Sequence, residues 1–256
     1  MSIWEALAVF AAGIGAGTIN TIVGSGTLIT FPVLLATGLP PVTATVSNAL
    51  GLIPGCISGA IGYRAEMAGQ RRRIVRLSVG AAIGAFAGAA LLLTLPPTAF
   101  ETIVPILVGL ALLLVLFQPY ISKAVKRRRE RNGTRTNPDG GPLLFVALTL
   151  ASVYGGYFTA AQGIIYMALM GMLLQDTMQR LNATKNMLAA VVNSVAALFF
   201  VFAAHIDWTA AGLIAVGSTI GGQIGAKVGR KLKPSVLRGV ILAVGTCAIL
   251  QLTLGG

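Results

Sequence analysis

The chain has 256 residues, of which 55% are hydrophobic and only 10% are charged, and its mean hydropathy is +0.84. A soluble domain of this size needs more charged residues to solvate its outside, so the composition excludes a soluble protein and indicates an integral membrane protein. The net charge of +12 would suggest nucleic acid in a soluble protein, but the basic residues here lie in short segments between apolar runs, as membrane topology requires.

The first apolar stretch, residues 13–35, has the length of a membrane helix but is interrupted at its centre. Glycines and small polar residues occupy the interruption, and Pro32 follows it. In a bilayer, such backbone is tolerated only where it is buried in protein or lines a watery cavity. We therefore predict a broken hairpin over residues 3–36, whose bend carries half of a binding site formed by Asn20, Gly24, Ser25, Gly26 and Thr27.

The positions of the 19 basic residues predict the topology of the remaining chain. They fall within 64–76, within 123–135, at Arg180 and Lys185, and within 227–238, whereas 95–98 and 205–208 carry none. By the positive-inside rule the basic segments are cytoplasmic and the other two are external. Both termini are then expected outside, and a basic linker over 121–142 is expected in the cytoplasm. The predicted segments are helices 43–63, 77–94 and 99–117, hairpin 143–174, and helices 186–204, 209–226 and 239–254.

The two halves, residues 1–120 and 143–256, resemble each other. Gly80, Gly84 and Gly88 correspond to Gly217, Gly221 and Gly225 at an offset of 137, and this spacing places each set on one helix face suited to close packing. Each half then contains one hairpin and three crossings, and this odd number inverts the second half relative to the first. The predicted fold is an all-α polytopic membrane protein with two inverted repeats, whose hairpins are re-entrant or form two short crossings each.

The second hairpin is expected to break near residues 155–163, where Gln162 and Gly163 stand in the place of Ser25 and Gly26. The helices after both hairpins begin with small polar residues, which are common helix caps. The inverted symmetry brings these helix starts beside the hairpin tips, where spare amides face the same cavity. We therefore add to the candidate site Thr45, Ser47, Asn48, Gln162, Gly163, Thr184, Lys185 and Asn186.

Other kinds of chemistry find no support. All seven acidic residues lie near helix ends or in loops, which disfavours a buried proton or sodium relay. No metal-ligand spacing, nucleophile elbow or phosphate loop is present, so neither a metal, a cofactor nor an enzymatic activity is predicted.

The residues resemble the TauE/SafE sulfite exporter family, also called the toluene-sulfonate uptake permease family. The resemblance rests on Ala16-Gly17-Thr18-Ile19-Asn20, Gly24-Ser25-Gly26-Thr27-Leu28-Ile29 and Phe31-Pro32-Val33-Leu34, followed by residues 43–48 and Ala183-Thr184-Lys185-Asn186. It implies transport of a small, often sulfur-containing anion across the bacterial inner membrane.

We therefore expect a secondary transporter that exports a small anion by alternating access about a midplane site, with the substrate and the lipid bilayer as its partners. Nucleic acid is not expected, and the sequence carries no signal of oligomeric state. Two alternatives stay open: a transporter of a neutral or cationic metabolite, and a non-transporting membrane scaffold whose basic loop binds a partner or anionic lipid.

Overall fold

The computed structural model describes residues 1–131, 139–228 and 246, and within these residues the regular elements are α-helices. In chain order they are α1 Ile3–Ile22, α2 Thr27–Ala36, α3 Pro41–Gly62, α4 Arg71–Thr94, α5 Pro97–Arg131, α6 Gly141–Tyr157, α7 Gln162–Leu173, α8 Met178–Ala203 and α9 Trp208–Val228.

The outer surface of the bundle is apolar. Among the described helices α1, α3, α4 and α8 are long and apolar enough to cross a membrane. The side chains of Trp4, Ile106 and Phe202 are 78%, 68% and 83% exposed. Apolar exposure on this scale suits contact with lipid rather than with water. The prediction of an all-α polytopic membrane protein is therefore confirmed.

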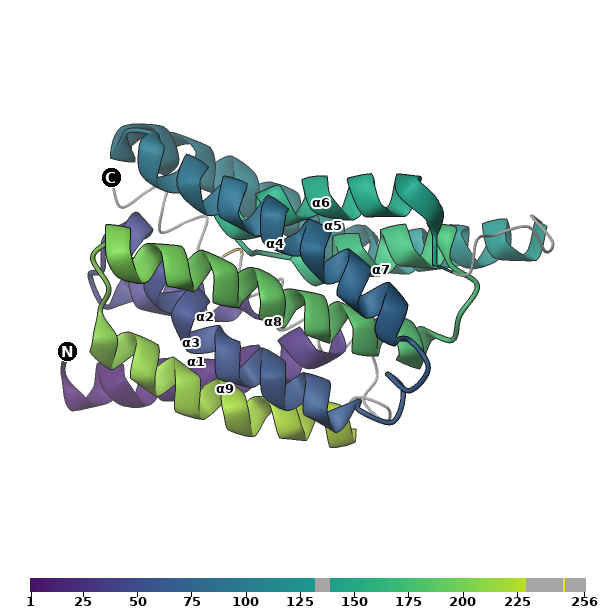
Figure 1. The fold of residues 1–256 in the computed structure, drawn as a ribbon. Coiled ribbons are helices and arrows are strands. Elements are labelled where there is room, and N and C mark those ends of the chain that lie inside the picture. The colour runs from purple at the N-terminus through teal and green to yellow at the C-terminus, as the bar shows by residue number, and fades with distance from the viewer. Residues whose placement is uncertain (132–138, 229–245, 247–256) are drawn as a thin grey trace.

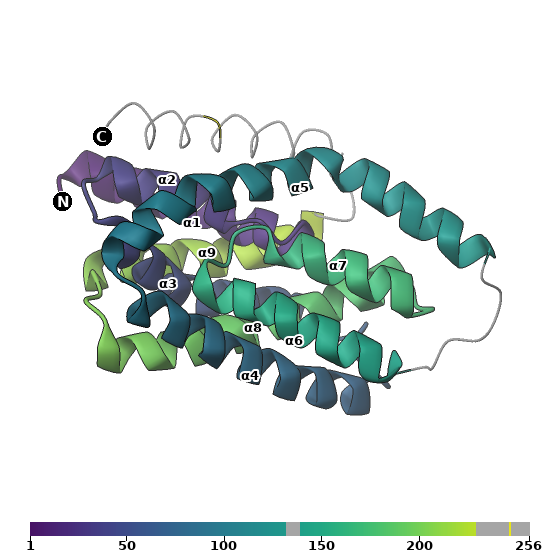
Figure 2. The ribbon, with the colours of Figure 1, turned by 90° about the horizontal axis from the view of Figure 1, so that it is seen from above.

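Apart from the α1–α2 and α6–α7 turns, the described connections between helices lie at two opposite ends of the bundle (Figures 1 and 2). Residues 63–70, residues 174–177 and the C-terminal end of α5 lie at one end, which we call the basic end. Arg180 Nη1 donates there to the carbonyl of Ala68 at 3.0 Å. The N-terminus lies at the other end, where the amide of Asp207 donates to Ser47 Oγ at 2.9 Å.

The two hairpins enter the bundle from opposite ends. Helices α1 and α2 enter from the end that holds the N-terminus, whereas α6 and α7 enter from the basic end (Figure 2). Their tips meet inside the bundle, where the amide of Gly163 donates to the carbonyl of Gly24 at 3.0 Å. The two predicted breaks, far apart in the sequence, are therefore in direct contact.

The glycine stripes allow each hairpin to pack against the other half of the chain. Gly84 and Gly88 of α4 lie against the backbone of α6, so an added Cβ would overlap Thr149 O and Val153 O. In the same way Gly225 of α9 lies against α1, where an added Cβ would be 2.7 Å from Thr18 O. Small residues at such interfaces let helix backbones approach closely.

Helix α4 of the first half packs on the second hairpin, and helix α9 of the second half packs on the first hairpin. This reciprocal packing and the opposite directions of the hairpins are compatible with inverted repeats. The relation between the two complete halves stays a prediction, because the helix expected over 239–254 lies outside the described residues.

Several helices are longer than the apolar runs predicted. Helix α5 continues to Arg131, so residues 121–131 are helical although we expected them in a loop. Helix α8 begins at Met178, where the hydroxyl of Thr177 accepts a hydrogen bond from the amide of Arg180 at 3.3 Å. Arg and Lys are good helix formers, so a helix can continue beyond its apolar segment.

These longer helices correct one expectation. Because α3 begins at Pro41 and α8 at Met178, residues 43–48 and 182–186 lie beyond the first helical residues. The amide of Ala44 already donates to Pro40 O at 2.8 Å. The prediction of helix starts with spare amides is therefore wrong for residues 44–48 and 182–186, whose side chains remain candidates for the site, whereas Thr43 lies in the first turn of α3.

Candidate functional site

The first hairpin tip is a tight turn between α1 and α2. The amides of Val23 and Gly24 both donate to Ile19 O, at 2.7 and 3.1 Å, and this ends α1. Gly24 has φ +91°, a conformation that glycine adopts without steric cost. Gly26 caps α2, and an added Cβ there would overlap the carbonyl of Ala16.

This tip carries several polar groups without a partner. Among the described residues, none accepts a hydrogen bond from the amides of Ser25, Gly26 or Thr27. The Ser25 side chain is also buried, at 1% exposure, and its hydroxyl has no partner in the described part. Unpaired amides at a helix N-terminus together with the positive end of the helix dipole favour an anion.

The second tip pairs the side chains of Gln162 and Tyr154 internally. Gln162 Nε2 donates to Tyr166 Oη at 2.6 Å, and this hydroxyl lies 2.5 Å from Ser152 Oγ. Tyr154 Oη donates to the carbonyl of Ala160 at 2.7 Å. Gln162 therefore holds its own hairpin together, although we predicted that it faces the site.

Lys185 lies where the two tips meet. Its side chain is 1% exposed, and a Cβ added at Gly163 would be 3.0 Å from Lys185 Cδ. Its Nζ donates to the carbonyls of Asn20 at 2.8 Å and Thr21 at 3.1 Å, which belong to the C-terminal end of α1. Within the described residues no carboxylate pairs with this ammonium group. Its positive charge is stabilised by the two carbonyls and by the negative end of the α1 dipole.

Two asparagines on the same face of α8 reinforce this contact. Asn182 Nδ2 and Asn186 Nδ2 both donate to the carbonyl of Thr21, at 3.1 and 3.3 Å. Residues three and four apart are neighbours on a helix, so Asn182, Lys185 and Asn186 form one cluster of donors. We call these three residues the α8 donor face.

On the other side of the first tip, Asn48 of α3 binds the start of α2. Its Nδ2 donates to Thr27 Oγ1 at 3.2 Å, and its Oδ1 accepts a hydrogen bond from Thr30. All three side chains are buried. Asn48 thus fixes the orientation of the hydroxyls on the first turn of α2.

Three predicted residues are engaged elsewhere. Ser47 accepts from the Asp207 amide near the end of the bundle, and Thr45 donates to Pro41 O of its own helix at 2.9 Å. Thr184 donates to Gln70 Oε1 at 3.1 Å, toward the basic end. The structure therefore brings together one set of predicted residues, which consists of Asn20, Gly24, Ser25, Gly26, Thr27, Asn48, Gly163, Lys185 and Asn186.

Comparison with known proteins identifies the family. A family model described as sulfite exporter TauE/SafE matches residues 9–252, which is nearly the whole chain. The chain belongs to the TauE/SafE family. This confirms the resemblance found in the sequence, and it makes the protein a multi-pass membrane transporter rather than a member of an enzyme class.

Curated relatives agree with this assignment. The probable membrane transporter protein YfcA of Escherichia coli is 26% identical over 235 residues, covering 90% of this chain and 82% of the relative. A probable membrane transporter protein of Haemophilus influenzae is 26% identical over 214 residues, covering 83% of this chain and 80% of the relative. No solved structure matches the chain.

Sequence reasoning missed some of the polar residues around the TauE/SafE tips. Cys56 is buried between Asn20 Nδ2 at 3.1 Å and Asn193 Nδ2 at 3.8 Å. Asn193 stands at an offset of 137 from Cys56, so the repeat would have pointed to it. Asn182 belongs to the predicted helix start over 182–186 but not to the predicted site residues, although helical spacing places it one turn before Asn186 on the same face.

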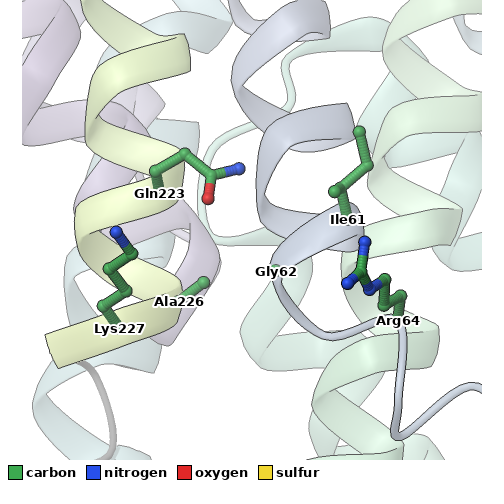
Figure 3. A pocket seen from close by; sticks show the side chains of 6 residues that line it. All are labelled: Ile61, Gly62, Arg64, Gln223, Ala226 and Lys227. Atoms are coloured by element: carbon green, nitrogen blue, oxygen red, sulfur yellow. The ribbon is translucent and has the colours of Figure 1, made fainter.

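A separate cleft of about 430 Å³ opens near the basic end, between the C-terminal turns of α3 and α9 (Figure 3). Beside it, Gln223 Nε2 donates to the Ser58 carbonyl at 3.0 Å and ties α9 to α3. The residues that line the cleft are Ile61, Gly62, Arg64, Gln223, Ala226 and Lys227.

Proposed function

We propose that this TauE/SafE protein carries a small oxyanion across the bacterial inner membrane, and that the α8 donor face and the first hairpin tip bind it. The observation that carries the proposal is the burial of Lys185, at 1% exposure, beside the contact between the tips. A lone cation at membrane depth is costly and marks a functional site by default. An anionic substrate would balance its charge.

The groups around Lys185 suit an oxyanion. Lysine has three N–H donors, and the contacts to Asn20 O and Thr21 O use two of them. Across the tip contact, the amides of Ser25, Gly26 and Thr27 and the hydroxyl of Ser25 have no protein acceptor in the described part. These unpaired donors favour an anion, and Asn182 Oδ1 is the one buried side-chain acceptor of the α8 donor face without a partner in the described part.

The opposed hairpins support alternating access. Each tip is formed by a broken helix, and such helices meet at the midplane site of many secondary transporters. Because the tips touch at Gly24 and Gly163, a separation at this contact would expose the site. The positive-inside rule places the basic end in the cytoplasm, with the N-terminus outside.

The distribution of acids supports export driven by the membrane potential. The described residues hold no fully buried Asp or Glu, and the 12% exposed Asp176 lies at the basic end rather than beside the tips. A relay for protons or sodium ions usually needs such a group. An anion that leaves a cell with a negative interior gains about 2.3 kcal/mol per charge for every 100 mV.

The test is anion flux in proteoliposomes that contain only this protein, with sulfite and benzenesulfonate as probes. Lys185→Met should lower the flux at least tenfold, because a hydrogen bond to a charged group contributes about 1.5–3 kcal/mol. Lys123→Met is the matched control, since Lys123 is exposed on α5, and it should transport like the wild type.

The other outcomes favour other functions. Wild-type flux that persists unchanged in Lys185→Met indicates a neutral or cationic substrate. Complete absence of flux for these anions and for a panel of metabolites indicates a scaffold. Anion influx that strictly requires a proton gradient contradicts potential-driven export.

A further inference from the structure

At the basic end, one carboxylate lies between two arginines from different halves of the chain. Asp176 Oδ2 is 2.7 Å from Arg73 Nη1, and Asp176 Oδ1 is 2.8 Å from Arg180 Nε. The side chains of Arg73 and Asp176 are only 11% and 12% exposed, so water screens this pair weakly. We call these three residues the arginine clamp.

The arginine clamp ties α8 to the segment between α3 and α4. Arg73 Nη1 also donates to Gln70 Oε1 at 2.8 Å, and Thr184 Oγ1 donates to the same oxygen at 3.1 Å. Arg180 Nη1 donates to Ala68 O at 3.0 Å. Arg180 precedes Lys185 by five residues, which corresponds to roughly 7 Å along the helix. The clamp therefore lies between the basic end and the α8 donor face.

The clamp consists of two guanidinium groups and one carboxylate, and Asp176 contacts both arginines. Burial alone raises the pKa of Asp176, but hydrogen bonds from Arg73 and the Thr177 amide and the charges of Arg180 and Arg73 lower it below its ordinary value. Asp176 is therefore ionised at neutral pH, and the three charges sum to +1. Guanidinium groups are planar forks that bind carboxylates and other oxyanions with two hydrogen bonds.

We propose that Arg73 and Arg180 are a second binding site for the transported oxyanion, and that Asp176 is a tethered carboxylate which occupies them until the substrate replaces it. This inference rests on the proposed function. Replacement of Asp176 would release the segment before α8 from Arg73 of α4 and so loosen the basic end on the route to Lys185. Entry of the anion and opening of the basic end are then one event, so the route stays closed without substrate.

The transport test compares two acidic residues of the basic end. Asp176→Asn removes the tethered competitor, and we expect the KM for sulfite supplied from the basic side to fall at least threefold. The control is Asp139→Asn, because Asp139 is 3.8 Å from Arg72, whose side chain is 92% exposed. Such surface pairs contribute little, so its KM should equal that of the wild type. Equal KM values for both variants overturn the proposal.

A second measurement needs no transport. Thr184→Cys, in a Cys56→Ser and Cys247→Ser background, places a thiol at a fully buried position beside Gln70. We expect an anionic methanethiosulfonate to modify it at least threefold faster when Asp176→Asn is added, but not when Asp139→Asn is added. In the background with Asp176 intact, saturating benzenesulfonate should also accelerate the modification.

The two measurements separate the two proposals. Equal modification rates with Asp176→Asn and Asp139→Asn overturn the clamp even if wild-type flux is normal. Faster modification with Asp176→Asn but no effect of benzenesulfonate overturns the binding of oxyanions there. Absence of anion flux in the wild type overturns the proposed function, while faster modification in Asp176→Asn would still identify the clamp as a closed gate.

Discussion

The tip of the α1–α2 hairpin turns on a glycine, whereas the tip of the α6–α7 hairpin turns on residues that carry side chains. Gly24 has φ +91°, and Thr159 and Ala161 have φ of 62° and 55°. The left-handed region costs an L-residue about 1–2 kcal/mol. Gly24 needs glycine for a further reason, because an added Cβ would overlap the Cα of Gly163. The second tip therefore carries strain, and the first avoids it.

The two tips also differ in what their polar groups contact. Ser25 is buried and its hydroxyl lacks a partner in the described part, whereas Gln162 donates to Tyr166 inside its own hairpin. In the proposed site the first tip offers its donors to the anion, and the second supports the backbone that contacts the first. The two hairpins thus have different roles in the proposed site.

The largest effect is expected at the contact between the tips. Gly24→Ala should abolish most of the anion flux and lower the free energy of unfolding by roughly 2–4 kcal/mol, since it combines backbone strain with overpacking. Gly163→Ala should cost roughly 1–3 kcal/mol from overpacking alone. Thermal unfolding in detergent and flux in proteoliposomes measure both effects.

The control for these variants is Gly212→Ala on α9, where an added Cβ has no neighbour within 4 Å. It should keep full flux and normal stability. If Gly24→Ala and Gly163→Ala behave like this control, the tips do not touch in the working protein.

The second prediction distinguishes a side chain that binds the anion, Ser25, from one that stabilises its own hairpin, Gln162. Ser25→Ala should raise the KM for sulfite about tenfold, because a hydrogen bond to a charged ligand is lost. Its thermal stability should not fall, since the hydroxyl has no protein partner in the described part. Gln162→Ala should do the reverse, with the apparent melting temperature lowered and KM changed less than threefold.

A fall in stability without a change in KM for Ser25→Ala would show that both tips are structural. A larger rise in KM for Gln162→Ala than for Ser25→Ala would show that the second tip, rather than the first, binds the anion.

The smallest effect concerns the strain in the second tip. Ala161→Gly should raise the free energy of unfolding by up to about 1 kcal/mol, because glycine adopts positive φ freely. Flux should be unchanged. Thermal unfolding of Ala161→Gly and Gly24→Ala tests the same positive φ with opposite substitutions, so the two variants should change stability in opposite directions. A lower stability of Ala161→Gly would contradict the prediction of strain at the second tip.

Much of this arrangement was predictable because it depends on local chemistry. Glycines and polar residues within apolar runs marked both breaks, and the spacing of Gly84 and Gly88 marked a packing face. Lys185 stood out as a cation apart from the large basic clusters. Helix ends were less predictable, since α5 continues through its basic segment to Arg131 without help from apolar patterning.

The sequence by itself determined that this protein is a polytopic membrane protein with interrupted apolar runs, because hydropathy, glycine spacing and charge placement act over one helix at a time. Its resemblance to the TauE/SafE family identified it as a transporter. Only the tertiary structure decided that Gly24 meets Gly163 and that the α8 donor face caps the end of α1. It also placed Asp176 between two arginines. The side chain of Gln162 donates to Tyr166 within its own hairpin instead of facing the site. These contacts join residues far apart in the chain, and a side chain's partner depends on how whole helices pack.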